Sequence, residues 1–193
     1  MSTTTVTPIP ERVQALDDLW LLRGSHPAPK NPDTPPPACF NEAITWLVEA
    51  EITDETWTDS HKCVSPVLRS FGMRLNDRLN DTDRQRLKSF ILPSIGTAGD
   101  GQDEVRRWMG ANWAYRTALP KWLDACGENE WAEKLRALPE LTSLDVFYEC
   151  GARKLARQVR DAMWERRRER EAQIQKAVEE ELKKRDLPKG AAV

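Results

Sequence analysis

The chain has 193 residues, and its 29 Lys and Arg nearly balance its 31 Asp and Glu, for a net charge of −2. This length fits one domain with appendages, and no apolar run approaches the roughly 20 residues that span a bilayer. The first residues, MSTTTVTPIPE, lack the basic and apolar regions of a secretory signal. We therefore expect a cytoplasmic protein that makes no contact with a membrane.

The first predicted element is a helix that begins at Pro10, because proline is well tolerated in the first turn of a helix. Val13, Leu16 and Leu19 follow at helical spacing. The preceding residues 1–9 are rich in Thr and Pro and are expected to be disordered. Residues 24–37 contain six prolines, which exclude regular structure and predict an extended surface loop.

Residues 39–143 have the apolar spacing of several helices. The clearest stripe lies within residues 40–48, and Pro66 is placed to begin another helix. No stretch shows the sustained period-two alternation of a strand. We therefore predict an all-α fold, with a compact multi-helix domain over residues 10–143.

Two groups of side chains in this domain are interpreted as structural. Asn112 and Arg116 lie on one helical face and are interpreted as a buried polar pair. Four tryptophans lie on or beside apolar stripes and are expected in the core, namely Trp46, Trp108, Trp113 and Trp122. A ligand pocket among the tryptophans is the alternative.

Residues 144–187 are predicted to form one long basic helix, with a short tail at residues 188–193. Its apolar side chains recur at every fourth position in two groups, which are Leu155, Val159 and Met163, and then Ile174, Val178 and Leu182. A helix of this length extends roughly 60 Å at 1.5 Å per residue. We expect part of it to project into solvent or to contact a partner.

The charge of the chain is unevenly distributed. Residues 151–193 hold thirteen Lys and Arg against eight Asp and Glu, a net of +5, and residues 1–150 hold sixteen against twenty-three, a net of −7. Such a difference between two parts of a chain is typical of an interaction segment.

Several short motifs resemble a family of uncharacterised helical proteins from actinobacteria and actinobacteriophages. They are GSH at residues 24–26, CVSPVLRSF at 63–71, LND at 75–77, RLK at 86–88, LPSIGT at 92–97, RWM at 107–109, NW at 112–113, PKWLD at 120–124 and LRALPELT at 135–142, together with Cys39 and the EA pair at 42–43. The resemblance covers about residues 24–143. It implies a compact helical domain of that extent in a phage or actinobacterial setting, and it implies no activity.

One group of residues is a candidate metal site. His26, Cys39, His61 and Cys63 include both histidines of the chain and supply the nitrogen and sulfur ligands that zinc prefers. The alternative is that the two cysteines are small core residues and the histidines lie at the surface, since cysteine is often buried and no C-x-x-C motif is present. A disulfide is a third interpretation, which a reducing cytosol disfavours.

The second candidate site is the basic part of the C-terminal helix. Arginine binds phosphate with two parallel hydrogen bonds, and a nearby tryptophan offers a surface for stacking. The residues concerned are Arg153, Lys154, Arg157, Arg160, Trp164, Arg166, Arg167, Arg168 and Arg170. The alternatives are a solvated helix partly neutralised by its glutamates, a protein contact, and a homodimer formed by the two apolar groups.

No pattern in the sequence indicates catalysis. There is no Walker lysine, no dinucleotide-binding glycine motif and no nucleophile elbow. We therefore expect a non-enzymatic interaction protein of phage or actinobacterial accessory type, which contacts a protein or nucleic acid through its basic helix. The alternative is a small zinc-binding protein whose His/Cys cluster is catalytic or sensory.

Overall fold

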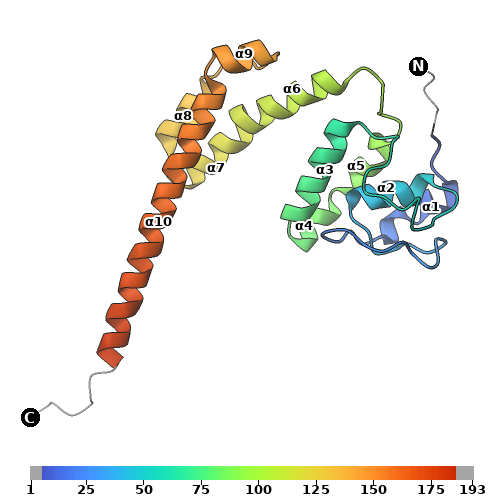
Figure 1. Ribbon diagram of the computed structural model, residues 1–193, viewed down its shortest axis with the longest axis horizontal. Helices are drawn as coiled ribbons and strands as arrows, with labels where there is room; N and C mark the ends of the chain where they lie inside the picture. Colours follow the sequence, from blue (N-terminus) through green and yellow to red (C-terminus); the bar gives the residue numbers. More distant parts are fainter. Residues whose placement is uncertain (1–5, 186–193) are drawn as a thin grey trace, which may run out of the picture. The chain divides into compact units, whose positions relative to one another are not determined.

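A computed structural model describes residues 6–185 of the chain. The regular elements of these residues are all helices, and no strand is present apart from one isolated bridge between Leu21 and Ala38. The all-α prediction is therefore confirmed (Figure 1). No helix of the described part combines the length and the apolar character needed to cross a membrane.

The chain divides into two compact units, one ending at Arg107 and the other beginning at Trp108. This division differs from the predicted domain over residues 10–143. The reason is that Leu123, Leu135 and Leu141 share a core with Ala152 and Val159, so residues 108–143 belong with the C-terminal helix.

Unit 1 is built around one almost fully buried helix. Its elements are α1 (Pro10–Gln14), the 3-10 turn η1 (Leu16–Asp18), α2 (Phe40–Val48), α3 (Pro66–Arg78), α4 (Asp81–Gln85), α5 (Lys88–Ser94) and the start of α6 (Asp103–Trp113). Every residue of α2 from Phe40 to Leu47 is buried, against α1, α3 and α5. Such burial on all sides is typical of a core helix.

Helix ends in unit 1 follow their sequence signals. Ser65 caps α3 by accepting hydrogen bonds from the backbone N–H groups of Val67 and Leu68, and Pro66 occupies the first turn as predicted. Asn80 caps α4 by accepting from the N–H of Asp83. The first helix is shorter than its apolar spacing predicts. It ends at Gln14, and a 3-10 turn follows.

The predicted disorder at the N-terminus is wrong for residues 6–9, and residues 1–5 lie outside the described part. Val6 packs against the core of unit 1, and the N–H of Ile9 donates to the carbonyl of Leu47 at 2.8 Å. The Thr- and Pro-rich composition of the segment gave no indication of these contacts, which bury apolar surface.

The proline-rich loop at residues 24–37 has no regular structure, as predicted. It is tied to unit 1 by tryptophan side chains. The indole of Trp46 donates to the carbonyl of Pro32 at 2.8 Å, and the indole of Trp57 donates to the carbonyl of His26 at 2.8 Å. The loop is therefore held against the domain.

Unit 2 contains the end of α6, the π-helical turn η2 (Ala114–Ala118), α7 (Leu119–Ala125), α8 (Asn129–Arg136), α9 (Leu144–Glu149) and α10 (Ala152–Arg185). The π turn ends two residues before Pro120, which lies in the first turn of α7. Because proline lacks an N–H and its ring crowds the carbonyl four residues earlier, a wider turn lets the chain remain helical there.

The single helix predicted over residues 144–187 is instead two helices. Gly151 adopts a positive φ of 73°, which ends α9 and separates it from α10. Glycine has no Cβ and takes this left-handed conformation without steric cost. Residues 186–187 and the predicted tail at 188–193 lie outside the described part.

Candidate functional site

His26 and Cys39 are brought together by a carboxylate that the sequence interpretation missed. Glu42 is 2% exposed, and its oxygens accept hydrogen bonds from the backbone N–H groups of His26 at 2.7 Å and Cys39 at 2.8 Å. The Nδ1 atom of His26 lies 2.8 Å from Oε2 of the same carboxylate. Cys39 is the N-cap residue just before α2, so Glu42 completes a capping box.

His61 and Cys63 form a second, separate cluster. The Nδ1 atom of His61 lies 2.9 Å from Sγ of Cys63, and its Nε2 atom lies 2.7 Å from Oε1 of Glu49. This order of thiol, imidazole and carboxylate resembles an activated nucleophile. However, Cys63 is buried and burial raises the pKa of its thiol, which disfavours the reactive thiolate.

The structure therefore does not assemble the predicted zinc ligands. His26 and Cys39 pair around one glutamate, whereas His61 and Cys63 pair beside another. Within residues 6–183, no group of three or more His, Cys, Asp or Glu side chains has the arrangement of a metal site. Each histidine instead hydrogen-bonds a glutamate near α2, Glu42 for His26 and Glu49 for His61.

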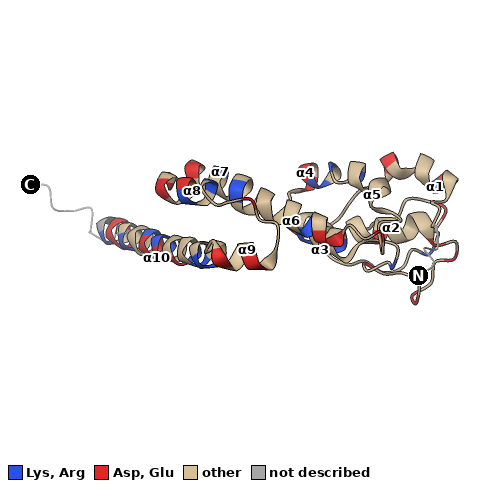
Figure 2. Cartoon of the chain, turned by 90° about the horizontal axis from the view of Figure 1, so that it is seen from above, with Lys and Arg blue, Asp and Glu red and all other residues tan. Residues whose placement is uncertain are grey.

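The C-terminal helix has a packed part and an exposed part. Ala152 and Val159 are buried in the core of unit 2, with Leu155 and Met163 packed beside them. From Trp164 to Lys183 every described side chain is exposed. Figure 2 shows that this helix carries Lys and Arg together with Asp and Glu along its length.

One exposed face of α10 is cationic. Arg153, Arg157, Arg160, Trp164 and Arg167 follow one another at spacings of four, three, four and three residues, and all five are exposed. This spacing keeps side chains on one face of a helix. We call these five residues the cationic stripe.

Only some cations of the predicted basic segment have an acidic partner. Arg160 pairs with Asp161 at 2.8 Å, Arg167 pairs with Glu171 at 2.7 Å, and Arg166 pairs with the buried Glu128 of unit 2. Within this segment, four cations make no ion pair or hydrogen bond with any described residue, and these are Lys154, Arg157, Arg168 and Arg170. Their charge is available to an anionic partner.

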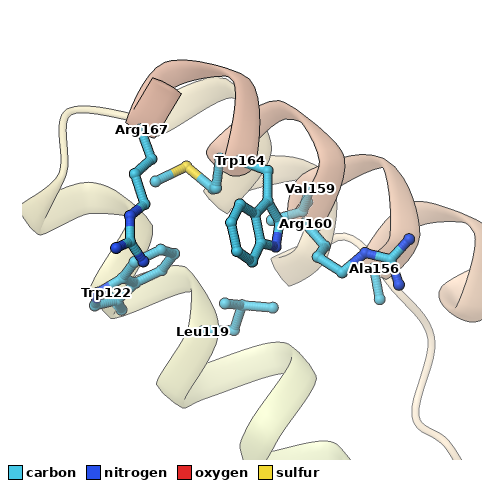
Figure 3. A pocket seen from close by; sticks show the side chains of 8 residues that line it. Leu119, Trp122, Ala156, Val159, Arg160, Trp164 and Arg167 are labelled. Carbon is cyan, nitrogen blue, oxygen red and sulfur yellow. The ribbon is translucent and has the colours of Figure 1, made fainter. Parts of the chain in front are cut away.

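A groove of about 510 Å³ lies between α7 and α10 beside the cationic stripe (Figure 3). Its lining includes the apolar side chains of Leu119, Ala156, Val159 and Met163. Two indoles, of Trp122 on α7 and Trp164 on α10, also line it. The charged groups of the lining are the guanidinium groups of Arg160 and Arg167.

The prediction that four tryptophans lie in the core is wrong for two of them. Trp46 and Trp108 are buried as predicted, but Trp113 and Trp122 are 50% and 48% exposed. Asn112 was predicted to pair with Arg116. Its side chain instead hydrogen-bonds the backbone N–H of Leu141 at 2.9 Å and the carbonyl of Leu141 at 2.8 Å. No local pattern identifies Trp122 as a groove residue, because the groove exists only where α7 packs beside α10.

No protein-family model, curated protein or solved structure matches this chain. The resemblance of residues 24–143 to a phage and actinobacterial family therefore stays a prediction. Functional inference rests on the chain's own geometry.

Proposed function

We propose that the protein is a non-enzymatic interaction protein of phage or actinobacterial accessory type, and that it binds nucleic acid through the basic part of α10. The observation that supports this most is the cationic stripe. Four arginines occur on one exposed face with an exposed indole among them. Guanidinium groups bind phosphate oxygens in pairs, and an indole stacks on bases.

The cations without an acidic partner favour an anionic ligand over a purely solvated helix. Arg157 and Arg168 are exposed and unpaired in the described structure. The acidic residues that follow them one turn along the helix are engaged elsewhere, since Asp161, four residues after Arg157, pairs with Arg160, and Glu171, three residues after Arg168, pairs with Arg167. The unpaired arginines release counterions when they bind phosphates, so affinity is expected to fall with salt.

The test compares two double variants of the full chain. Arg157→Gln with Arg168→Gln removes two unpaired cations from the basic segment. Lys176→Gln with Lys183→Gln removes the same charge from the same helix, outside that segment. Binding to a labelled oligonucleotide is measured by fluorescence anisotropy over a range of salt concentrations.

The arginine variant is expected to bind more weakly and to lower the slope of log K against log salt by about 0.7 to 0.9 for each phosphate that it no longer neutralises. The lysine variant is expected to keep most of the affinity. Equal losses in both variants would show that only net charge matters and would contradict a site in the basic segment. A wild-type chain that binds no nucleic acid at low salt would leave α10 to a protein partner and overturn the proposal.

A further inference from the structure

Two large aromatic side chains remain exposed at the groove between α7 and α10. Trp122 is 48% exposed and Trp164 is 56% exposed, and they come from different helices of unit 2. Exposed indoles next to apolar groove surface leave apolar area in water that a ligand can cover. Figure 3 shows both rings beside the groove, with Leu119 near them.

The charged residues beside the two indoles indicate what kind of ligand the groove can bind. Arg160 and Arg167 lie on α10 four residues before and three residues after Trp164, so a cation occurs on each side of the indole. Their ion pairs with Asp161 and Glu171 are exposed to solvent, and such surface pairs are weak enough for a phosphate to displace. The guanidinium carbon of Arg167 is 5.6 Å from the centre of the Trp164 ring. A ligand that fits this arrangement has a flat apolar part for the indole and negative charge for the arginines.

We infer that the groove binds an unpaired base of a single-stranded nucleic acid, with the neighbouring phosphates on Arg160 and Arg167. This inference rests on the proposed function and adds the class of nucleic acid to it. A base in a duplex is stacked and paired, so it presents no face to an indole, whereas an unpaired base presents both faces. The protein therefore prefers single strands to duplexes.

An apolar peptide is the other occupant of an apolar groove. The pair of arginines favours the nucleotide, because a base and its phosphates satisfy the indoles and the guanidinium groups together. A peptide would need acidic side chains placed on both sides of one apolar anchor. The two occupants differ in one measurable property, which is whether binding depends on a nucleobase.

The first experiment uses the wild-type chain and three probes of equal length, about 12 nucleotides. They are an oligothymidylate, an abasic strand with the same number of phosphates, and a duplex. Anisotropy titrations at one salt concentration are expected to give at least about fivefold tighter binding to oligothymidylate than to the abasic strand, since one stacked base contributes at least that factor.

The second experiment locates the base. Trp122→Leu and Trp164→Leu remove the indoles but keep an apolar side chain, and far-UV circular dichroism checks that the helices persist. Trp20→Leu is the matched control, because Trp20 is 55% exposed and lies in unit 1. Both groove variants are expected to lose the preference for oligothymidylate over the abasic strand, with duplex binding unchanged. The control is expected to retain the preference.

The outcomes separate this inference from the proposed function. Equal binding of oligothymidylate and the abasic strand overturns the base site and leaves phosphate binding by α10 in place. A base preference that survives both groove substitutions places the base elsewhere and also overturns the inference. Failure of every probe to bind at low salt overturns the proposed function itself, and the base site with it.

Discussion

At the scale of single residues, the buried carboxylate of Glu42 is a strongly constrained side chain of unit 1. Its two oxygens accept hydrogen bonds from two backbone N–H groups and hydrogen-bond a histidine ring. A carboxylate that is 2% exposed is tolerable only when such groups replace its lost hydration. Glu42 therefore fixes the start of α2 and the beginning of the proline-rich loop at His26.

Replacing this carboxylate is expected to destabilise the protein. Glu42→Gln removes the charge and places an amide NH₂ where one of the donors now points. We expect the free energy of unfolding to fall by about 2 kcal/mol or more, since hydrogen bonds to charged groups contribute about 1.5–3 kcal/mol each. Urea denaturation measures the change. Glu55→Gln, at an exposed loop position, is the control, and an equal loss in both variants would contradict a special role for Glu42.

Cys39 is expected to make stability depend on alkaline pH. Burial raises the pKa of its thiol from 9.0 to about 12, because the interior disfavours the charged thiolate. The stabilising contribution is complete below pH 9, where the thiol is protonated in both states. Above pH 9 the unfolded chain loses this proton first, so stability falls until the folded thiol also ionises near pH 12.

The measurement is the free energy of unfolding at pH 8 and at pH 10, for the wild type and for Cys39→Ala. Each pH unit between the two pKa values removes up to about 1.4 kcal/mol. The wild type is expected to lose about that amount more than Cys39→Ala over this interval. Identical losses in the two proteins would show that the thiol is not protected by burial.

At the scale of elements, the distal part of α10 presents a second apolar group that the described residues of unit 2 leave uncovered. Ile174, Val178 and Leu182 are each half-exposed and recur at every fourth residue. An antiparallel pair of α10 helices centred on Val178 would place Ile174 opposite Leu182.

We therefore expect a homodimer of this antiparallel kind, as the sequence interpretation allowed. It should be weak, since only three apolar side chains of each helix are covered and association costs at least about 4 kcal/mol. Light scattering at two concentrations about a hundredfold apart is expected to show a rising mass. Val178→Asn should abolish the rise, whereas Ala172→Asn places the same side chain on another face and should not. A monomer mass at both concentrations contradicts the dimer.

Helix ends were predicted best where neighbouring residues in the sequence mark them. Pro66 and Ser65 mark the start of α3 because a helix begins where its first N–H groups find a cap and proline lacks an N–H. The glycine that separates α9 from α10 is equally visible in the sequence. Its effect was missed because a single glycine inside a helical pattern is compatible with either a continuous helix or a break.

At the scale of the whole molecule, the chain has two separate apolar cores. Leu47 is fully buried in the core of unit 1, and Leu135 is fully buried in the core of unit 2. Each core brings together residues that are distant in the sequence. Leu16 and Ile91 share the core of unit 1, and Trp108 and Val159 share the core of unit 2. A substitution that leaves a cavity in one core is therefore expected to destabilise mainly the unit that contains that core.

Leu47→Ala and Leu135→Ala test this organisation. Each is expected to lower the stability of its unit by about 2–5 kcal/mol, because it removes buried methyl groups and leaves a cavity. Hydrogen exchange measured by mass spectrometry is expected to rise in α2 and α5 for the first variant and in α7 and α8 for the second. A rise confined to the wrong unit would contradict the division at residue 107.

The candidate site was predicted only in part. The basic residues of α10 are exposed, in keeping with the rarity of buried arginine and lysine, and their role as a binding site stays a prediction. Trp122 was assigned to the core and Glu42 was not singled out. Both errors concern partners that are far away in the sequence, such as Trp122 beside Trp164 and Glu42 beside His26.

The helical class, the irregular proline-rich loop and the concentration of positive charge in the last helix all follow from the amino-acid sequence alone. These properties depend on backbone dihedrals and on the local order of side chains. The separation of the histidines and cysteines around two glutamates required the folded chain, and so did the groove that two tryptophans share with two arginines. The physical reason is that these arrangements depend on which helices pack together, and that packing is determined by the two apolar cores.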